Sequence, residues 1–445
     1  MGKQLFGTDG IRGVAGEPPL DPRTVYACGL ALGADLNLRT TDPEVLIGMD
    51  TRESGAGIAA HLAGGLAAEG VRFRFAGVIT TPGVAHLTRT VPFAAGVMIS
   101  ASHNPYQDNG IKVFSATGYK LPDDEEHLVE EEIFRTLETG FQPRPASLSA
   151  EAALPQRYLE YLLSTAATPL TGMRLVLDCG NGAAFQLAPE LFRRAGAEVT
   201  VIGGSPDGRN INRDCGALHV DALRQRVLEA GADAGVAFDG DADRAILVSG
   251  SGKIIDGDHV LLIAARSLQQ AGRLAGNTVV STVMSNLGLE RALDRLGIRM
   301  LRTPVGDKYV LEEMIRQGAV LGGEQSGHVI FREFSTTGDG MLTALRVLEI
   351  ARAANQTLDS LTDDLAIYPQ RLVNIPVRER RPLNEMPLLQ KAIAESERAL
   401  DSSGRVLVRF SGTEPLARVM VEGPSLAIVE MHSSRIADVI RAELA

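Results

Sequence analysis

Short apolar runs rich in β-branched residues alternate with helical patterns along most of this chain. Such alternation favours an α/β fold, because strands separated by helices are joined by crossovers that pair them in parallel. In the first unit, Asp21 and Pro22 suit the start of a helix. Strands are then expected at residues 45–49, 72–76 and 95–99. The third of these strands ends just before Ser102.

The pattern also indicates where domains begin and end. A segment rich in Pro, Ser and Ala at residues 139–154 suggests a first boundary, and a chain of 445 residues is long enough for about two to four domains. Near residue 368 the order changes to strand, helix, strand, strand and helix. We therefore expect three α/β domains and a smaller α+β domain, at residues 1–152, 153–254, 255–368 and 369–445.

The net charge of −11 limits the classes of partner. An acidic surface repels nucleic acid and anionic membranes at long range, so neither partner is expected. The composition, with 44% hydrophobic and 22% charged residues, is that of a chain that folds throughout. An anionic small-molecule substrate would need basic residues gathered locally around it.

Cysteine usage indicates a reducing compartment. Cys28, Cys179 and Cys215 are odd in number and lack metal-ligand spacing, so no disulfide framework is predicted. The first 16 residues lack the apolar core of a signal peptide. No apolar run approaches the roughly 20 residues that span a bilayer. We expect a cytoplasmic protein.

The most specific motif is an acidic loop between two apolar strands, Asp239-Gly240-Asp241-Ala242-Asp243-Arg244. Its three carboxylates repel one another unless a cation neutralises them. Hard oxygen ligands with few protein donors suit Mg²⁺, which takes the rest of its shell from water and phosphate. An acidic hairpin turn is the alternative, but a turn needs one Asp and not three.

A second loop, Ser100-Ala101-Ser102-His103-Asn104-Pro105, follows the strand at 95–99, where open α/β sheets place ligand sites. Ser102 is the candidate nucleophile. No Gly-x-Ser-x-Gly elbow occurs in the sequence, so a serine hydrolase is unsupported. Taken alone, an Asn-Pro turn explains this loop at least as well. His103 and the nearby Lys112 are further candidates for the same pocket.

Two more loops offer polar groups to a sugar phosphate. One combines glycines with groups suited to sugar hydroxyls, namely Glu324, Gln325, Ser326 and His328. The other leaves a strand and offers backbone N–H groups, hydroxyls and a guanidinium to a phosphate, at Arg409, Ser411, Gly412 and Thr413, with Arg418 beyond it. Each signal is weak by itself, since a plain turn explains the second loop about as well.

In this order and at these separations, the four loops resemble one family over the whole chain, the α-D-phosphohexomutases. The family pattern has a Ser-His-Asn-Pro loop, an Asp-Gly-Asp-x-Asp-Arg loop, a Gly-Glu-x-Ser-Gly loop and an Arg-x-Ser-Gly-Thr-Glu-Pro loop, all intact here. The resemblance implies three similar α/β domains with mixed sheets around a central cleft. It also implies a C-terminal α+β domain that acts as a phosphate-binding lid.

The resemblance implies a reaction as well. A phosphorylated Ser102 would give its phosphoryl group to a sugar monophosphate, and the resulting 1,6-bisphosphate would return its other phosphate to Ser102. One Mg²⁺ per active site would be held by Ser102, Asp239, Asp241 and Asp243. The residues expected to assist catalysis are Arg12, His103, Lys112 and Arg244. Those expected to hold the substrate are Glu324, Gln325, Ser326, His328, Arg409, Ser411, Gly412, Thr413 and Arg418.

Within this family, the sequence is most similar to isomerases that interconvert glucosamine 6-phosphate and glucosamine 1-phosphate, through glucosamine 1,6-bisphosphate, for UDP-N-acetylglucosamine synthesis. The similarity rests on residues 6–13, on Gln325 and on residues 303–310. Lys308 departs from the pattern, which has Arg at this place, and the two cations bind phosphate differently. A homodimer is compatible with the resemblance.

Three other functions remain open from the sequence. A phosphomannomutase or phosphoglucomutase would share all four loops. A metal-dependent sugar phosphatase would share the aspartates and the phosphoenzyme, but it would release inorganic phosphate. A sugar-phosphate binding protein without catalysis would have no use for Ser102 or for the three aspartates.

Overall fold

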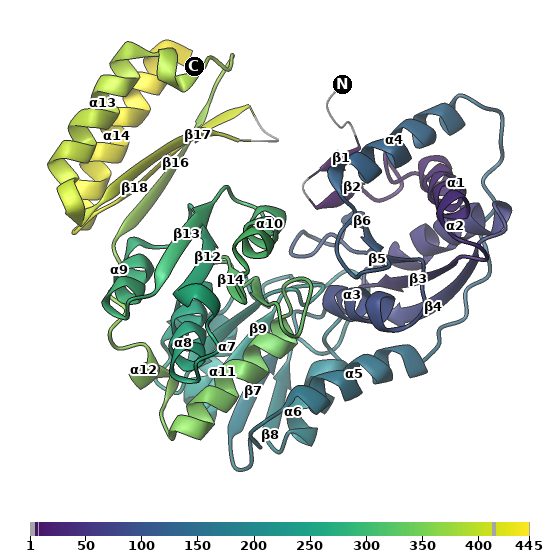
Figure 1. Ribbon diagram of the computed structural model, residues 1–445, viewed down its shortest axis with the longest axis horizontal. Helices are drawn as coiled ribbons and strands as arrows, with labels where there is room; N and C mark the ends of the chain where they lie inside the picture. Colours follow the sequence, from purple (N-terminus) through teal and green to yellow (C-terminus); the bar gives the residue numbers. More distant parts are fainter. Residues whose placement is uncertain (1–4, 8, 412–414, 445) are drawn as a thin grey trace. The chain divides into compact units, whose positions relative to one another are not determined.

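The computed structural model describes residues 5–7, 9–411 and 415–444, and the chain forms two compact units (Figure 1). The first unit comprises Met1–Val283 and Leu301–Thr362, and the second comprises Met284–Met300 and Asp363–Ala445. The chain therefore enters the second unit, returns to the first, and enters the second again. Each unit is described by itself below.

The first sheet of the first unit has six strands in the order β1-β2-β6-β5-β3-β4. The central strand β3 (Glu44–Met49) pairs in parallel with β4 (Arg72–Val78) and β5 (Ala95–Ile99). Antiparallel pairing then adds β6 (Asp108–Ser115), β2 (Gly10–Val14) and β1 (Phe6–Gly7). The sheet is therefore mixed, and its antiparallel half carries Lys112 and Arg12.

Four helices accompany this sheet: α1 (Pro22–Arg39), α2 (Gly55–Ala68), α3 (Thr81–Thr90) and α4 (Asp123–Leu137). Asp21 begins α1, because its carboxylate accepts the N–H groups of Arg23 and Thr24. α1 and α2 pack with their backbones close, since a Cβ on Gly29 would lie 2.2 Å from the carbonyl oxygen of Leu62. The core beneath them is built from buried aliphatic residues such as Val45, Ile47 and Leu66.

The second sheet has five strands in the order β11-β10-β9-β7-β8. β7 (Arg174–Asp178) pairs in parallel with β8 (Glu198–Ile202) and β9 (Ala234–Phe238). β9 and β10 (Ala245–Ser249) form an antiparallel hairpin, which β11 (Ile254–Ile255) extends. Its helices are α5 (Ala153–Thr165), α6 (Leu187–Arg194) and α7 (Asp221–Ala230). The acidic loop is the connection within the β9–β10 hairpin.

The third sheet has the order β13-β12-β14-β15. β12 (Thr278–Thr282) is parallel to β14 (Leu321–Gly323), and β14 is antiparallel to β15 (Val329–Phe331). The other elements of this part are β13 (Arg299–Thr303), α8 (Gly257–Gln270), a 3-10 turn η1 (Ala275–Asn277), α10 (Asp307–Gln317), α11 (Gly340–Ala354) and α12 (Leu358–Leu361). The Glu324 loop connects β14 to β15.

The second unit is built on a three-stranded antiparallel sheet, in the order β16-β18-β17. Its strands are β16 (Gln370–Pro376), β17 (Arg405–Phe410) and β18 (Leu416–Glu422), and its helices are α9 (Leu287–Arg295), α13 (Pro387–Leu400) and α14 (Leu426–Leu444), with short 3-10 turns η2 (Leu383–Glu385) and η3 (Asp401–Ser403). Asn286 ties α9 to this unit, because its side chain exchanges hydrogen bonds of 2.9 and 3.0 Å with the backbone of Tyr368.

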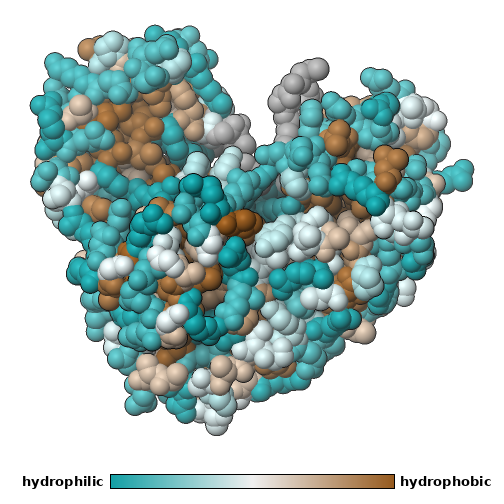
Figure 2. Space-filling model, viewed as in Figure 1, coloured by the Kyte–Doolittle hydropathy of each residue, from teal (hydrophilic) through white to brown (hydrophobic). Residues whose placement is uncertain are grey.

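The second unit leaves apolar surface uncovered. Figure 2 shows hydrophobic side chains gathered on its visible face. Among the described residues, its large exposed hydrophobic side chains are Ile367, Leu372, Leu388, Leu426 and Met431. A small unit has much surface for its volume, so incomplete burial of this kind is expected.

The predicted fold class is confirmed: α/β with mixed sheets, and a smaller C-terminal α+β part. The boundaries placed at residues 152, 254 and 368 stay a prediction. Within the described residues, no helix is both long enough and apolar enough to cross a membrane.

Candidate functional site

Ser102 lies in a turn that leaves the carboxyl end of β5. It is buried, and its φ of 51° lies in the left-handed region, which non-glycine residues seldom adopt. The hydroxyl of Ser100 accepts the Ser102 N–H at 2.9 Å. The hydroxyl of Ser102 donates to Oδ2 of Asp239 at 2.5 Å. The turn therefore presents the serine oxygen directly to the acidic loop.

A buried arginine fixes this turn. Arg52 donates to the carbonyl oxygens of Ser102, Asn104 and Asp108 at 2.9, 2.8 and 3.0 Å, and also to that of Pro105. Asp50 holds Arg52 in place through an ion pair of 2.8 Å. A single guanidinium thus binds several carbonyl groups of the turn at once, and the Asn212 side chain also donates to those of Ser102 and Asn104, at 2.9 and 3.2 Å.

The acidic loop gathers three carboxylates. Ligand oxygens of Asp239, Asp241 and Asp243 lie within 4.8 Å of one another, and all three residues are buried. Gly240 permits this approach, because a Cβ there would lie 2.5 Å from the carbonyl oxygen of Ser102. Thr81 donates its hydroxyl to Asp241 at 2.5 Å. The acidic loop therefore contacts the serine turn through Gly240 and is also bound by Thr81 of α3.

Two oxygens of this loop fit the first coordination shell of a metal ion. Oδ1 of Asp241 and Oδ1 of Asp243 are buried, and neither accepts a hydrogen bond from the described residues. Buried carboxylate oxygens normally find donors or cations. Only oxygen donors are present, which suits a hard divalent cation. The donor set therefore fits a metal ion.

The electrostatics of the loop favour a cation beside Asp239. Burial, together with repulsion from Asp243 and Asp241, raises the pKa of Asp239 well above its ordinary value. Burial would also raise the pKa of Asp243, but Lys112 and other cations hold it below its usual range. The carboxylates of Asp239 and Asp243 are thus unequal, and a cation beside Asp239 would favour its ionised form.

Lys112 connects this loop to the first sheet. Its buried Nζ lies 2.9 Å from Asp241, 3.1 Å from Asp9 and 3.7 Å from Asp243. Burial alone would lower the pKa of Lys112, but these carboxylates raise it above its ordinary value. Lys112 is therefore protonated in this arrangement.

His103 and two arginines lie beside the same carboxylates. Burial, Arg244 and Arg12 lower the pKa of His103 to about 4, so its imidazole is neutral near neutral pH. Arg12 donates to the carbonyl oxygen of Ala101 at 2.9 Å. The backbone N–H of Arg244 donates to Asp239 at 3.2 Å, and its side-chain Nε lies 3.7 Å from Oδ1 of Asp243. The catalytic candidates of the first two loops are thus brought together.

The loop between β14 and β15 that carries Glu324, Gln325, Ser326 and His328, called the sugar loop below, reaches the same place from the third sheet. Oε1 of Glu324 accepts the N–H of Gly306 at 3.1 Å, and Oε2 accepts the hydroxyl of Ser326 at 3.4 Å. Nδ1 of His328 lies 3.5 Å from Asp243, and Nε2 accepts the N–H of Gly338 at 3.0 Å. The carbonyl oxygen of Gln325 accepts the Gly257 N–H at 3.0 Å.

Acidic and basic side chains from three sheets form a closed ring around this point. Successive contacts of 3.1, 2.5, 2.6, 3.7, 3.5 and 3.7 Å link Lys112, Asp9, Lys120, Asp307, His328, Asp243 and again Lys112. Lys308 stands outside the ring, because its Nζ pairs with Asp123 at 2.5 Å.

The fourth loop belongs to the second unit. Arg409 of β17 and Arg418 of β18 are direct partners across the sheet. Burial and the neighbouring Arg418 lower the pKa of Arg409. Like charges directly opposite each other destabilise a sheet unless an anion lies between them. The N–H of Ser411, the residue that follows β17, donates to the carbonyl oxygen of Leu416 at 2.8 Å. Gly412 and Thr413 lie outside the described residues.

Several residues of this site were missed in the sequence analysis. Open α/β sheets place ligand sites just past the carboxyl ends of their strands, which is how Ser102 was identified. Asp50 and Arg52 follow the carboxyl end of β3, so the same rule applied to them. Asp9, Lys120 and Asp307 are single charged residues far apart in the sequence. No local pattern signals that they converge.

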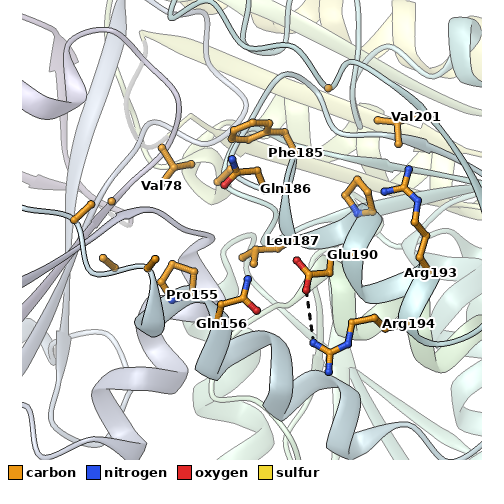
Figure 3. A pocket seen from close by; sticks show the side chains of 17 residues that line it. Val78, Pro155, Gln156, Phe185, Gln186, Leu187, Glu190, Arg193, Arg194 and Val201 are labelled. Atoms are coloured by element: carbon orange, nitrogen blue, oxygen red, sulfur yellow. Dashed lines mark ion pairs between the residues drawn. The ribbon is translucent and has the colours of Figure 1, made fainter.

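A separate surface pocket of about 1070 Å³ lies elsewhere in the first unit (Figure 3). Its lining is largely apolar, with Val78, Phe185 and Leu187 among its residues. Arg194, which also lines it, is paired with Glu160 and Glu190 at 2.7 and 3.6 Å. None of the described residues that line this pocket belongs to the loops above, so it is not part of the candidate site.

Four domain families match consecutive parts of the chain. They are described as phosphoglucomutase/phosphomannomutase alpha/beta/alpha domains I, II and III and the C-terminal domain of the same proteins. The matched segments are residues 3–139, 156–252, 256–368 and 372–439, respectively.

Individual relatives extend over the full chain. A phosphoglucosamine mutase of Solibacter usitatus is 65% identical over 444 residues and covers 100% of both chains. A phosphoglucomutase/phosphomannomutase family protein of Burkholderia thailandensis has a similar fold, with a TM-score of 0.81, 24% identity and 98% and 97% of the two chains covered. An N-acetylphosphoglucosamine mutase of Aspergillus fumigatus, solved with GlcNAc-6P and magnesium, has a TM-score of 0.67, 20% identity and coverage of 99% and 96%.

Proposed function

This chain belongs to the phosphoglucomutase/phosphomannomutase family, and on that premise we propose that it is a phosphoglucosamine mutase. The reaction interconverts glucosamine 6-phosphate and glucosamine 1-phosphate. The name of the Solibacter relative, at 65% identity over the full chain, supports this substrate. The observation that carries the mechanism is the 2.5 Å contact between the Ser102 hydroxyl and Asp239, inside a cluster of three buried carboxylates.

Ser102 is the phosphoryl carrier in this proposal. In the first half-reaction, the bond between phosphorus and Ser102 Oγ breaks, and a bond forms from phosphorus to the free hydroxyl of the sugar monophosphate. The product is glucosamine 1,6-bisphosphate, and Ser102 regains a proton. After the bisphosphate turns over, the second half-reaction returns its other phosphate to Ser102. Positioning and charge neutralisation supply most of the catalysis in transfers of this type.

Asp239, Asp241, Asp243 and an oxygen of phosphorylated Ser102 would hold one Mg²⁺. The ion supplies positive charge next to the transferred group. Oδ1 of Asp241 and Oδ1 of Asp243, which accept no hydrogen bond from the described residues, support this assignment. Arg12 and Arg244, whose side chains contact the serine turn and the acidic loop, add fixed positive charge for the phosphoryl oxygens.

Lys112 and His103 are the proton-transfer candidates, and their protonation states suggest different roles. Burial would lower the pKa of Lys112, but the carboxylates around it raise that pKa, so Lys112 carries an ammonium group that can donate a proton to a departing oxygen. His103 is neutral near neutral pH, so it can accept one from a sugar hydroxyl. Comparison of His103→Gln with Lys112→Met in single-turnover experiments, one for each direction of transfer, separates the two roles.

The remaining loops hold the substrate. Glu324, Ser326 and His328, with Gln325 between them, would bind sugar hydroxyls. Arg409, Arg418 and Ser411, with Gly412 and Thr413, would bind the phosphate that does not react. The facing arginines of β17 and β18 support the second assignment.

The test is kcat/KM of the phosphorylated, Mg²⁺-loaded protein on glucosamine 6-phosphate, glucose 6-phosphate and mannose 6-phosphate, each with its bisphosphate. A preference of about tenfold or more for glucosamine 6-phosphate, or 1.4 kcal/mol, supports the proposal. A preference for glucose or mannose phosphate retains the mechanism and rejects the substrate. Release of inorganic phosphate as the main product rejects the mutase reaction.

A further inference from the structure

Asp307 is a charged residue of the site to which the proposed mechanism gives no role. It begins α10, directly after Gly306, whose N–H is bound by Glu324 of the sugar loop at 3.1 Å. Its Oδ2 also lies 3.7 Å from Nε2 of His328, another member of that loop. Asp307 therefore shares the wall of the site where the sugar ring is expected to bind.

The surroundings of Asp307 already hold one primary ammonium group. Nζ of Lys120 lies 2.6 Å from Oδ2 of Asp307 and 2.5 Å from Oδ1 of Asp9. Burial alone would raise the pKa of Asp307, but Lys120 holds it below its ordinary value, so the carboxylate is ionised at neutral pH. The contacts with Lys120 and His328 both use Oδ2, which leaves Oδ1 as the oxygen to offer to a ligand.

We propose that Asp307 binds the ammonium group of the amino sugar and thereby selects glucosamine phosphates over hexose phosphates with a neutral group at C2. A carboxylate gains a charge-assisted hydrogen bond from an ammonium group, whereas a hydroxyl or an acetamide offers only a neutral donor. Glu324 is less suited to this role, because both of its oxygens already accept hydrogen bonds. The inference rests on the proposed function, since it concerns the same site and reaction.

The experiment compares wild type with Asp307→Asn, which keeps the shape of the side chain and removes its charge. The readout is kcat/KM on glucosamine 6-phosphate, glucose 6-phosphate and N-acetylglucosamine 6-phosphate, at a pH where the free amine is protonated. We expect a loss of about tenfold or more on glucosamine 6-phosphate and a change of less than about threefold on the two neutral sugars. An equal loss on all three sugars, or no loss on any, overturns the proposal.

Asp123→Asn is the matched control. Asp123 begins α4, pairs with Lys308, the residue next to Asp307, and is largely exposed. Removal of its charge alters the same edge of α10 without touching the proposed ammonium site. We expect no change in the order of preference among the three sugars. If Asp123→Asn reproduces the sugar-dependent loss, a general change in the local field explains it, and the specific contact is rejected.

A measurement on wild type alone covers the case in which Asp307→Asn does not fold. We expect glucosamine 6-phosphate to exceed 2-deoxyglucose 6-phosphate by about tenfold or more in kcat/KM, with glucose 6-phosphate close to the 2-deoxy sugar. Equal values for all three contradict the inference. A wild-type protein that isomerises no hexose phosphate contradicts the proposed function, so the two failures are distinguishable.

Discussion

Two regions of this molecule are suited to bind phosphate, and they are built in opposite ways. The serine turn and the acidic loop of the first unit are buried and bring three carboxylates together beside Ser102. The Arg409–Arg418 pair of the second unit is purely cationic and lies on adjacent strands of a small sheet. The first is suited to a phosphate that is transferred with the help of an added cation. The second is suited to a phosphate that is only held.

The difference also appears in how each region is supported. Arg52, Asn212 and Thr81 approach the first region from separate loops and helices, and they donate hydrogen bonds of 2.9, 2.9 and 2.5 Å to its backbone or side chains. The second region depends chiefly on strand register, which places the two arginines opposite each other. Changes in the first region should therefore affect the chemical step, and changes in the second should affect substrate binding.

The largest effect is expected for Ser102→Ala. Removal of the proposed phosphoryl carrier should lower kcat by about a thousandfold or more, and the phosphoserine expected on wild type should be absent from the corresponding peptide in mass spectrometry. Ser100→Ala is the control, because Ser100 only orients the Ser102 N–H and Asp50. It should cost far less and keep the phosphopeptide. A Ser102→Ala variant with most of its activity would eliminate the covalent mechanism.

Asp241→Asn should come next. The substitution removes one negative charge from the acidic loop, so Mg²⁺ affinity measured by calorimetry should fall at least about tenfold, and kcat should fall about a hundredfold. The exposed Asp221, at the start of α7, supplies the control Asp221→Asn, for which neither quantity should change. If Mg²⁺ affinity is unchanged in Asp241→Asn, the acidic loop is not a Mg²⁺ site, and the first region does not depend on an added cation.

Arg409→Met tests the second region. Loss of one guanidinium should raise KM for the sugar phosphate about tenfold, whereas kcat and Mg²⁺ affinity should change little. Arg398→Met, on α13, removes an exposed arginine of the same unit and should leave KM unchanged. If Arg409→Met lowers kcat and leaves KM intact, the division between transfer and holding fails.

The smallest expected effect is a pH-dependent change in stability at Asp339. Burial raises the pKa of this carboxyl to about 6, although it accepts hydrogen bonds from Leu342 and Tyr158. The folded state therefore binds the proton more tightly than the unfolded state does. The corresponding stability is present at low pH and is lost as the pH rises from about 4 to about 6.

Asp339→Asn removes this titration while its amide can still cap α11. The melting temperature of the variant relative to wild type should therefore be higher by a few degrees at about pH 8 than at about pH 4.5. If the difference in melting temperature between variant and wild type does not vary with pH, burial does not raise the pKa of Asp339. The Arg409–Arg418 pair of the second unit should contribute no such change in stability over this pH range.

The sequence was most informative where a function occupies a few consecutive residues. Three aspartates at alternate positions predict a cation site without any knowledge of the fold, and the structure brings their oxygens within 4.8 Å. The alternation of strand and helix patterns likewise predicted the α/β class. Both signals are local, so each can be seen in a single segment.

The rest depended on topology. Asp9, Lys120 and Asp307 are separated by about a hundred residues or more, and they converge only because elements of the first and third sheets meet. The grouping of α9 with the second unit was also missed, because its own pattern is that of an ordinary amphipathic helix. Single charged residues and shared interfaces leave no periodic signal in one sequence.

The hydrogen bond between Ser102 and Asp239 has a thermodynamic consequence. A phosphate on this oxygen would put further negative charge beside three carboxylates, so phosphorylation and cation binding at this point must strengthen each other by the same factor. A molecule that loses its phosphate would then also release its cation more readily. Dephosphorylated and phosphorylated enzyme would then differ in metal content as well as in phosphate. The cellular concentration of free Mg²⁺ would influence how much of the enzyme stays phosphorylated.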